Sequence, residues 1–421
     1  MTTPPVIKES YPNQRPYVRR DLVYTPNPND PFSSCIIKNP KTRRYFRVSK
    51  QVALVMQAMD GTRTIADIRA KFTLSSQSIQ SLMTILSNLK LIEHIVDDDL
   101  SQKSLNNSQK RKEDTGFNIL FFKKELIEPD KWIERIYNSF RLKYIFDPYC
   151  GIGLCIIYIL AYLVYRSNTP VMKLALIELA DPKWIVVGWA VWLVDAILHE
   201  LAHGFACKHF GGTVYSIGIG IYYFRPIFYC DVTDAWMFRR SQRIITHSAG
   251  IFMSLFLGSF AVFVIGFFGE RSPNISAIAM LFFGISGVRS LANLNPLLKL
   301  DGYFLLADGL GIENLRHKAF SYLFMVLRSI PYRLGIVKKS NFIKNNYDFK
   351  KWLPMLLYAL LSFAYIIAIF SFIGYQVGEL LASYIGKLGW LFSLSLVVIL
   401  LGVLLRKRWE AYKNPSTTRI I

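Results

Sequence analysis

Six long apolar stretches, separated by polar segments, run through the chain from residue 149 onward. They cover residues 149–165, 184–207, 246–268, 275–297, 353–373 and 388–405. Each is close to or above the length that an α-helix needs to cross the hydrocarbon core of a bilayer. The pattern predicts a polytopic α-helical membrane protein with about six transmembrane helices.

The chain before the first apolar stretch has a different periodicity. Short β-type runs come first, three segments with helical apolar spacing follow, and a strand-like run ends the region. The expected elements are strands at 36–37 and 45–48, helices at 52–59, 65–72 and 76–90, and a strand at 91–95. This order predicts a small winged-helix-like α+β domain at residues 34–97.

The other segments are polar or mixed in composition. Residues 1–33, rich in Pro, Asn and basic residues, predict a flexible N-terminal arm, and residues 98–115 predict a flexible linker. Aromatic and basic residues alternate through 116–148, which predicts an interfacial amphipathic segment. The remaining expected parts are a membrane core at 149–310, a basic cytoplasmic loop at 311–352, two C-terminal spans within 353–405, and a cytoplasmic tail at 406–421.

Composition agrees with a membrane location, and the charge distribution predicts the orientation. The chain is 52% hydrophobic, and its 50 Lys and Arg against 29 Asp and Glu give a net charge of +21. If the N-terminus is cytoplasmic, nearly all of these cations fall in cytoplasmic loops, as the positive-inside rule requires. We therefore expect a multi-pass protein of the cell membrane, in a bacterium the inner membrane, with both termini cytoplasmic and no nucleic-acid partner.

Targeting and disulfide patterns add little to this picture. The first twenty residues contain no apolar run, so no cleavable signal peptide is expected. The five cysteines are too few and too scattered to predict a disulfide framework.

The second apolar stretch ends in the sequence His199-Glu200-Leu-Ala-His203. Residues four apart lie on one face of a helix, so both imidazoles can bind one zinc ion, and Glu200 can act as general base on a water molecule. Ionisable side chains within an apolar span are costly and usually functional. The motif predicts a zinc site with one ion per chain.

A tetrahedral catalytic zinc needs a third protein ligand. Asp301 is the favoured candidate, because it follows Pro296 at the end of the fourth stretch and lies toward the same side of the membrane as the two histidines. Cys207 is the alternative, since it continues the spacing of four beyond His203.

The motif His-Glu-Leu-Ala-His, followed about a hundred residues later by Asn293-Leu-Asn-Pro-Leu-Leu-Lys-Leu-Asp301-Gly, resembles the site-2 protease family of intramembrane zinc metalloproteases. The resemblance covers about residues 149–310. It implies zinc bound by the two histidines and Asp301, Glu200 activating the water, and Asn293 polarising the scissile carbonyl. The chain departs from the family at Ser254, where an Asn is common, and it lacks a proline after Gly250.

Further residues are expected around this site. Alternating apolar and small residues between 211 and 229 predict a β-hairpin or re-entrant segment, and the resemblance implies that it presents an edge to an extended substrate. The expected substrate-binding residues there are Gly218, Gly220 and Tyr222. Asp195, one turn before His199, is expected to contact the imidazole or to face a water-filled cavity, and Arg289 is expected to pair with Asp195 or a substrate carbonyl.

The N-terminal pattern, with the phrase Thr64-Ile-Ala-Asp-Ile, resembles the leader-peptide recognition domains related to the chaperone of pyrroloquinoline quinone biosynthesis. Together the two resemblances imply a membrane zinc endopeptidase that processes a ribosomally made peptide or another membrane-associated substrate near the cytoplasmic face. A non-proteolytic membrane scaffold or export partner is an alternative. A membrane-tethered DNA-binding regulator is a further one, although the helix at 76–90 is poor in Lys and Arg.

Overall fold

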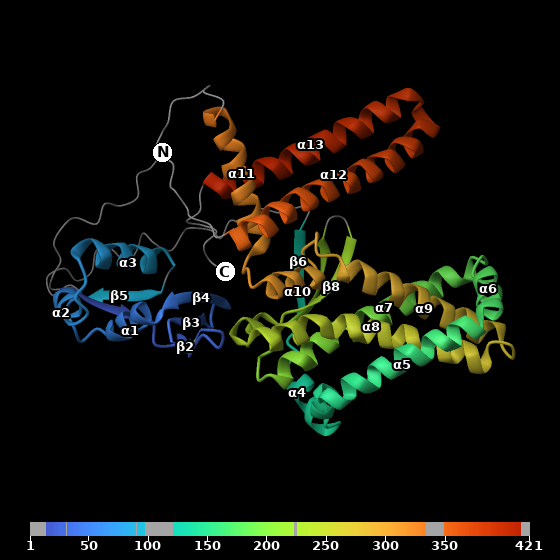
Figure 1. The fold of residues 1–421 in the computed structure, drawn as a ribbon, viewed down its shortest axis with the longest axis horizontal. Coiled ribbons are helices and arrows are strands. Elements are labelled where there is room, and N and C mark those ends of the chain that lie inside the picture. Colours follow the sequence, from blue (N-terminus) through green and yellow to red (C-terminus); the bar gives the residue numbers. More distant parts are fainter. Residues whose placement is uncertain are drawn as a thin grey trace. The chain divides into compact units, whose positions relative to one another are not determined.

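The described residues form two compact units, one at residues 14–96 and the other at residues 121–413 (Figure 1). The structure is a computed structural model that describes residues 14–30, 32–89, 91–96, 121–222, 225–333 and 349–413. The predicted linker at 98–115 lies outside the described residues, as do both chain ends and part of the predicted basic loop.

The first unit contains two antiparallel sheets and three helices. Its elements are β1 (Arg15–Val18), β2 (Val23–Pro26), β3 (Ser34–Asn39), β4 (Arg44–Ser49), α1 (Lys50–Ala58), α2 (Ile65–Lys71), α3 (Ser76–Asn88) and β5 (Ile92–Val96). β1 pairs with β5, and the other sheet has the order β2-β3-β4. The helices occur where the apolar spacing predicts them, and each begins after an N-cap hydroxyl, which is that of Ser49, Thr64 or Ser75.

The prediction of a flexible arm over residues 1–33 is wrong for its described part. β1 and β2 both lie within this range. Val18 and Leu22 are buried in one hydrophobic core with Ile37 and Met56. The two strands have four residues each and contain prolines, so their apolar alternation is too short to stand out in the sequence.

Long helices form most of the second unit. They are α5 (Pro148–Ser167), α6 (Thr169–Glu178), α7 (Lys183–His209), α8 (Arg240–Phe268), α9 (Pro273–Leu294), α10 (Asp301–Leu310), α11 (Leu315–Arg333), α12 (Phe349–Ile385) and α13 (Lys387–Lys413). α8 contacts α5, α7, α9 and α10, so it lies at the centre of the packing. The shorter helix α4 (Asp130–Ser139) and two short 3-10 helices, η1 (Leu142–Phe146) and η2 (Thr233–Met237), complete the helical elements of this unit among the described residues.

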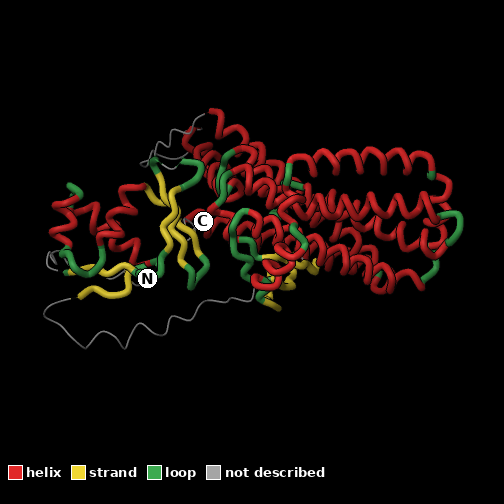
Figure 2. Tube along the Cα trace, turned by 90° about the horizontal axis from the view of Figure 1, so that it is seen from below, coloured by secondary structure: helices red, strands yellow, loops and turns green. Residues whose placement is uncertain are grey.

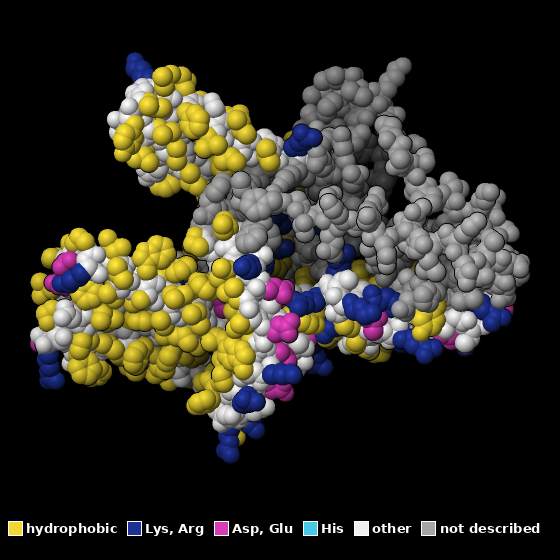
Figure 3. All heavy atoms as spheres, turned by 180° about the vertical axis from the view of Figure 1, so that it is seen from behind, with side chains coloured by type: hydrophobic (Ala, Val, Ile, Leu, Met, Phe, Trp, Pro, Cys, Tyr) yellow, Lys and Arg dark blue, Asp and Glu magenta, His cyan; other side chains and the backbone are white. Residues whose placement is uncertain are grey.

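Five of these helices are long and apolar enough to cross a membrane. The apolar segments are Tyr149–Ser167, Lys183–His209, Arg240–Phe268, Pro273–Leu294 and Trp352–Ile385, and a shorter one covers Lys387–Val403. Large apolar side chains such as Trp189, Phe260 and Leu291 are exposed on these helices. Figure 3 shows hydrophobic side chains over much of the described surface. These features are consistent with a multi-pass helical membrane protein, while the count of six spans stays a prediction.

A three-stranded antiparallel sheet accompanies the helices. It consists of β6 (Phe121–Ile127), β7 (Ile217–Tyr222) and β8 (Arg225–Cys230) in that order. Figure 2 shows the second unit as helical apart from this sheet. β7 and β8 form a hairpin where the sequence predicts one, and its entry into the membrane stays a prediction.

The segment at 116–148 differs from the expected interfacial segment. Its described part begins with β6, which pairs with β7, and continues with helix α4 (Asp130–Ser139). Ile133 of α4 is fully buried against Cys207 and Val214. The apolar face of α4 therefore packs on α7 and on the segment before β7. The sequence of α4 shows that this face is apolar, but it does not show that a protein surface rather than the membrane covers it.

Candidate metal centre

Two histidines lie one turn apart on a buried face of α7. Four residues separate them, so His199 and His203 project from the same side of the helix, and their exposed fractions are 1% and 5%. Nδ1 of His199 lies 3.1 Å from the hydroxyl of Ser254. Nδ1–H of His203 donates to the carbonyl of Thr246 at 2.7 Å. Because both Nδ1 atoms are engaged, both Nε2 atoms are left for a shared ligand.

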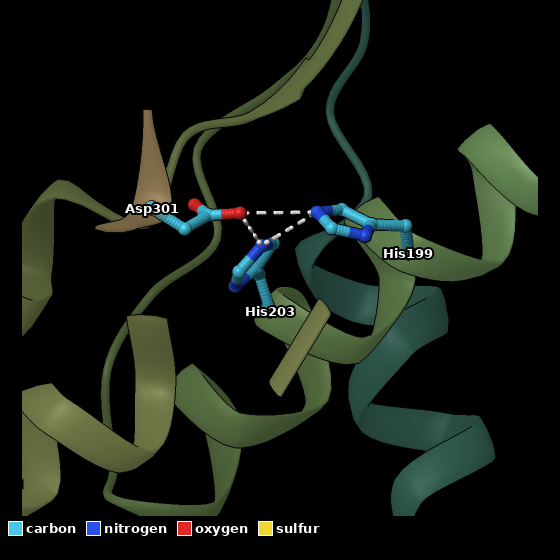
Figure 4. A group of neighbouring side chains, drawn as sticks. All are labelled: His199, His203 and Asp301. Carbon is cyan, nitrogen blue, oxygen red and sulfur yellow. Dashed lines mark hydrogen bonds and ion pairs between the residues drawn. The ribbon is translucent and has the colours of Figure 1, made fainter. Parts of the chain in front are cut away.

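Asp301 reaches the same point from the first turn of α10. Its Oδ2 lies 3.1 Å from Nε2 of His199 and 3.4 Å from Nε2 of His203, and the two Nε2 atoms are 3.3 Å apart (Figure 4). A tetrahedral zinc with bonds of about 2.0–2.1 Å holds its ligand atoms about 3.3–3.4 Å from one another. The three donor atoms are therefore spaced as zinc requires.

The chemistry of the donors also suits a metal ion. Burial favours the neutral acid, yet the two neighbouring histidines hold the pKa of Asp301 below its ordinary value. The ionised carboxylate is the form that binds a metal. Groups of three or more His, Cys, Asp or Glu side chains can hold a metal ion when their ligand atoms lie within 4.8 Å of one another. Among the described residues, these three side chains form the one such group. Cys207, the alternative ligand, is buried in a separate apolar cluster with Ile133 and Val214.

Gly250 on α8 leaves the space that an ion would fill. A Cβ atom at this position would lie 2.4 Å from Nε2 of His203 and 2.5 Å from Nε2 of His199. These distances are only slightly longer than a zinc–nitrogen bond of about 2.0–2.1 Å. Only glycine therefore allows α8 to pass this close to the two donor nitrogens while the space for the ion stays open.

Glu200 is held by the hairpin. The backbone N–H of Cys230, at the end of β8, donates to Oε2 of Glu200 at 2.9 Å. The N–H of the next residue, Asp231, donates to Ser216 on the side of β7. Successive residues of a strand direct their N–H groups to opposite edges. Glu200 therefore lies at the outer edge of β8, away from β7.

The other residues expected at the site lie on α9 and on α7, one turn before His199. Nδ2 of Asn293 lies 3.2 Å from Nε2 of His199, so its amide is beside the metal position. Nε of Arg289 lies 2.8 Å from Oδ2 of Asp195, and the hydroxyl of Ser286 donates to Oδ1 of Asp195 at 2.8 Å. This buried pair joins α7 to α9 one helical turn from His199 and Asn293.

Gly218, Gly220 and Tyr222, the expected substrate-binding residues, offer no free strand edge, and their contact with a substrate stays a prediction. They belong to β7, which is the central strand and pairs with β6 on one side and β8 on the other. Gly218 also has a packing reason. A Cβ on Gly218 would lie 2.7 Å from the hydroxyl of Tyr229, so the small residue lets this aromatic side chain cross the sheet.

Several contacts of the site could not be assigned from the sequence. The hydrogen-bond partners Ser254, Thr246 and Cys230 each act on a motif residue at least thirty positions away, and two of them do so through backbone atoms. The available signal is on α8, where Thr246, Gly250 and Ser254 recur at a spacing of four, as residues on one helix face do.

Comparison with known proteins gives one informative relative. The "Putative peptide zinc metalloprotease protein YydH" of Bacillus subtilis (strain 168) is 27% identical to this chain over 161 residues, which cover 36% of this chain and 62% of that protein. No protein-family model matches the chain, and no solved structure matches it. The chain is thus similar, over part of its length, to a protein named as a zinc metalloprotease.

Proposed function

We propose that this chain is a membrane-embedded zinc endopeptidase of the site-2 protease type. The partial similarity to a named zinc metalloprotease and the apolar helices support a membrane metalloprotease in general. The observation that carries the finer proposal is the triangle of donor atoms from His199, His203 and Asp301, with sides of 3.1, 3.3 and 3.4 Å. Glu200 follows directly after the first of these ligands in the chain.

The reaction is the hydrolysis of a peptide bond, and this chain's residues take defined parts in it. Bound zinc supplies Lewis acidity, which polarises the scissile carbonyl and lowers the pKa of a water molecule. Glu200 accepts a proton from the water as its oxygen bonds to the carbonyl carbon, and passes a proton to the nitrogen as the C–N bond breaks. The amide of Asn293 donates a hydrogen bond to the carbonyl oxygen, where negative charge develops.

An extended substrate would be held at β8. A peptide bond must leave its helix before it can be hydrolysed, and pairing with a sheet edge keeps a peptide extended. In this sheet β8 has no described strand on its outer edge, and it directs that edge toward Glu200. This replaces Gly218, Gly220 and Tyr222 with β8 as the proposed substrate-binding strand.

The substrate class and orientation follow from the two sequence resemblances and the charge distribution. We propose a peptide or membrane-associated substrate that is cleaved near the cytoplasmic face, with a leader segment bound by the N-terminal unit. Both termini would then be cytoplasmic, because nearly all Lys and Arg residues in the loops fall on that side.

Glu200→Gln is the decisive test, because it keeps the shape of the side chain and removes the base. The purified full chain in detergent is incubated with a quenched-fluorescent peptide library, and its zinc content is measured by atomic absorption. We expect the wild type to cleave, chelation to stop cleavage, and Glu200→Gln to lose cleavage while keeping about one zinc per chain. Undiminished cleavage by Glu200→Gln would end the assignment. A wild type that binds zinc without cleaving would favour a scaffold instead.

A further inference from the structure

A second buried ion pair lies beyond the metal-binding residues, between α8 and α10. Arg243 directs Nε to Oδ1 of Asp308 at 2.9 Å and Nη2 to the same oxygen at 2.6 Å. The two residues are 5% and 8% exposed. Neither belongs to the proposed catalytic machinery, so a buried charge pair at this place needs its own explanation.

The spacing on the two helices connects this pair with the metal site. Asp308 lies seven residues after Asp301 on α10, and Arg243 lies seven residues before Gly250 on α8. Seven residues are close to two helical turns, so each pair of positions shares one helix face. The ion pair and the metal site are thus two ends of one contact between the helices.

A ring contact fills the space between these two ends. His247 of α8 stacks on Phe304 of α10 with ring centroids 4.9 Å apart and an interplanar angle of 17°. Nε2 of His247 also lies 3.9 Å from Oδ2 of Asp308. The order of contacts along α10 is therefore the reverse of the order along α8, which is the arrangement of two antiparallel helices in a single register.

Stability alone does not account for the ion pair. Replacing a buried pair by well-packed apolar residues is often neutral or stabilising, whereas directional buried pairs are best attested as devices that fix register. Register is what Asp301 needs. A slip of α10 by one residue would move it about 1.5 Å along the axis, while metal ligands must lie within about 0.2 Å of their ideal distances.

We propose that Arg243 and Asp308 are positioning residues that fix the register of α10 on α8 and thereby hold Asp301 at the metal. The proposal rests on the proposed zinc site. It predicts that removing the ion pair weakens zinc binding even though neither residue touches the ion.

The test measures metal binding by the full chain in detergent, independently of proteolysis. Zinc affinity is obtained by competition with a chromophoric chelator, and the coordination is followed by the visible absorption of the Co²⁺-loaded protein. Asp308→Asn is compared with Asp301→Asn, which removes the ligand itself. Asp234→Asn is the matched control, because Asp234 is 1% exposed and accepts hydrogen bonds from Thr213 and Tyr215, away from α10.

We expect Asp308→Asn to weaken zinc binding by about tenfold or more, the range known for residues that orient ligands. Its Co²⁺ spectrum should shift toward that of Asp301→Asn. Asp234→Asn should keep the wild-type spectrum even if it lowers the melting temperature. Arg243→Lys keeps the positive charge but loses the two-nitrogen contact of the guanidinium with Asp308, so its zinc affinity should lie between those of the wild type and Asp308→Asn. If Asp308→Asn does not fold, the zinc affinity of Arg243→Lys tests the positioning role.

Wild-type zinc affinity and an unchanged Co²⁺ spectrum in folded Asp308→Asn and Arg243→Lys would overturn the positioning role and leave the proposed function intact. A wild type that binds no zinc would remove the proposed function, and with it this inference.

Discussion

The sharpest prediction concerns Gly250, because a single methyl group added there would occupy the space for the metal. In Gly250→Ala the new Cβ would lie 2.4 Å from Nε2 of His203, and 2.5 and 2.6 Å from Nε2 and Cδ2 of His199. Ordinary van der Waals contacts between such atoms are about 3.5 Å or more. Each of the three contacts is thus short by about 1 Å.

The overlap can be relieved only by moving the histidines. α8 is packed against four helices, so the imidazoles must turn and give up their bonds to Ser254 and Thr246. Zinc can bind only when both imidazoles return to the positions that overlap the new methyl group, so the overpacking of about 1–3 kcal/mol is a cost of the bound state. Since about 1.4 kcal/mol is a factor of ten, zinc affinity should fall by about tenfold to a hundredfold.

Chelator competition on the purified full chain measures this loss. Gly258→Ala is the matched control on the same helix, since a Cβ there would meet only Ser286 at 3.6 Å and a backbone oxygen at 4.0 Å. It should bind zinc within about twofold of the wild type. If Gly250→Ala kept wild-type affinity, α8 could not lie where the structure has it, and the reasoning from this glycine would be refuted.

Two further predictions test the ligand set and the acid sensitivity of the first unit. Asp301→Ala should lose most of its zinc and Cys207→Ala should keep it, as measured by metal content after gel filtration; the reverse result would reassign the third ligand. Hydrogen bonds from Thr64 hold the pKa of Asp67 below its ordinary value. A lowered pKa stabilises the fold above the unfolded pKa of about 4, and this stability is lost as the pH falls below it. Amide exchange in α2, corrected for the intrinsic rate, should therefore rise between about pH 4 and 2 more in the wild type than in Asp67→Asn; equal rises would contradict the role of the cap.

The main elements of the site follow from local sequence. The spacing of His199 and His203 requires only that α7 is helical, and the apolar stretch makes that secure. Asp301 needs one more step, namely that the fourth apolar stretch, rising about 1.5 Å per residue, ends at the same membrane depth as the two histidines, and this depth stays a prediction. The structure has Oδ2 of Asp301 at 3.1 and 3.4 Å from the two Nε2 atoms.

Strand pairing between distant parts of the chain limited how much of the sheet could be predicted from the sequence. β6 lies some ninety residues before β7, and nothing in its own sequence identifies β7 as its partner. The hairpin alone therefore did not reveal that Gly218 and Gly220 have no free edge, because a hairpin considered without β6 has two open edges and the three-stranded sheet leaves β7 with none. The short strand β1 was missed for a related reason, since it pairs with β5, far later in the chain. β2 pairs with the neighbouring β3, and its four residues, one of them a proline, are too few to show an apolar alternation.

α8 carries a pattern that could have been used further. Arg243, His247, Gly250 and Ser254 recur at spacings of four, three and four, which places them on one face of a helix. An apolar span would gain by filling these positions with large aliphatic residues, so a row of polar and small residues needs a partner inside the protein. Each of the four has one: Asp308, Phe304, the two Nε2 atoms of the metal site, and Nδ1 of His199. One face of α8 therefore both orients the histidine ligands and fixes the position of α10. Mutations on this face should lower zinc affinity more than they lower the rate at which a bound substrate is cleaved.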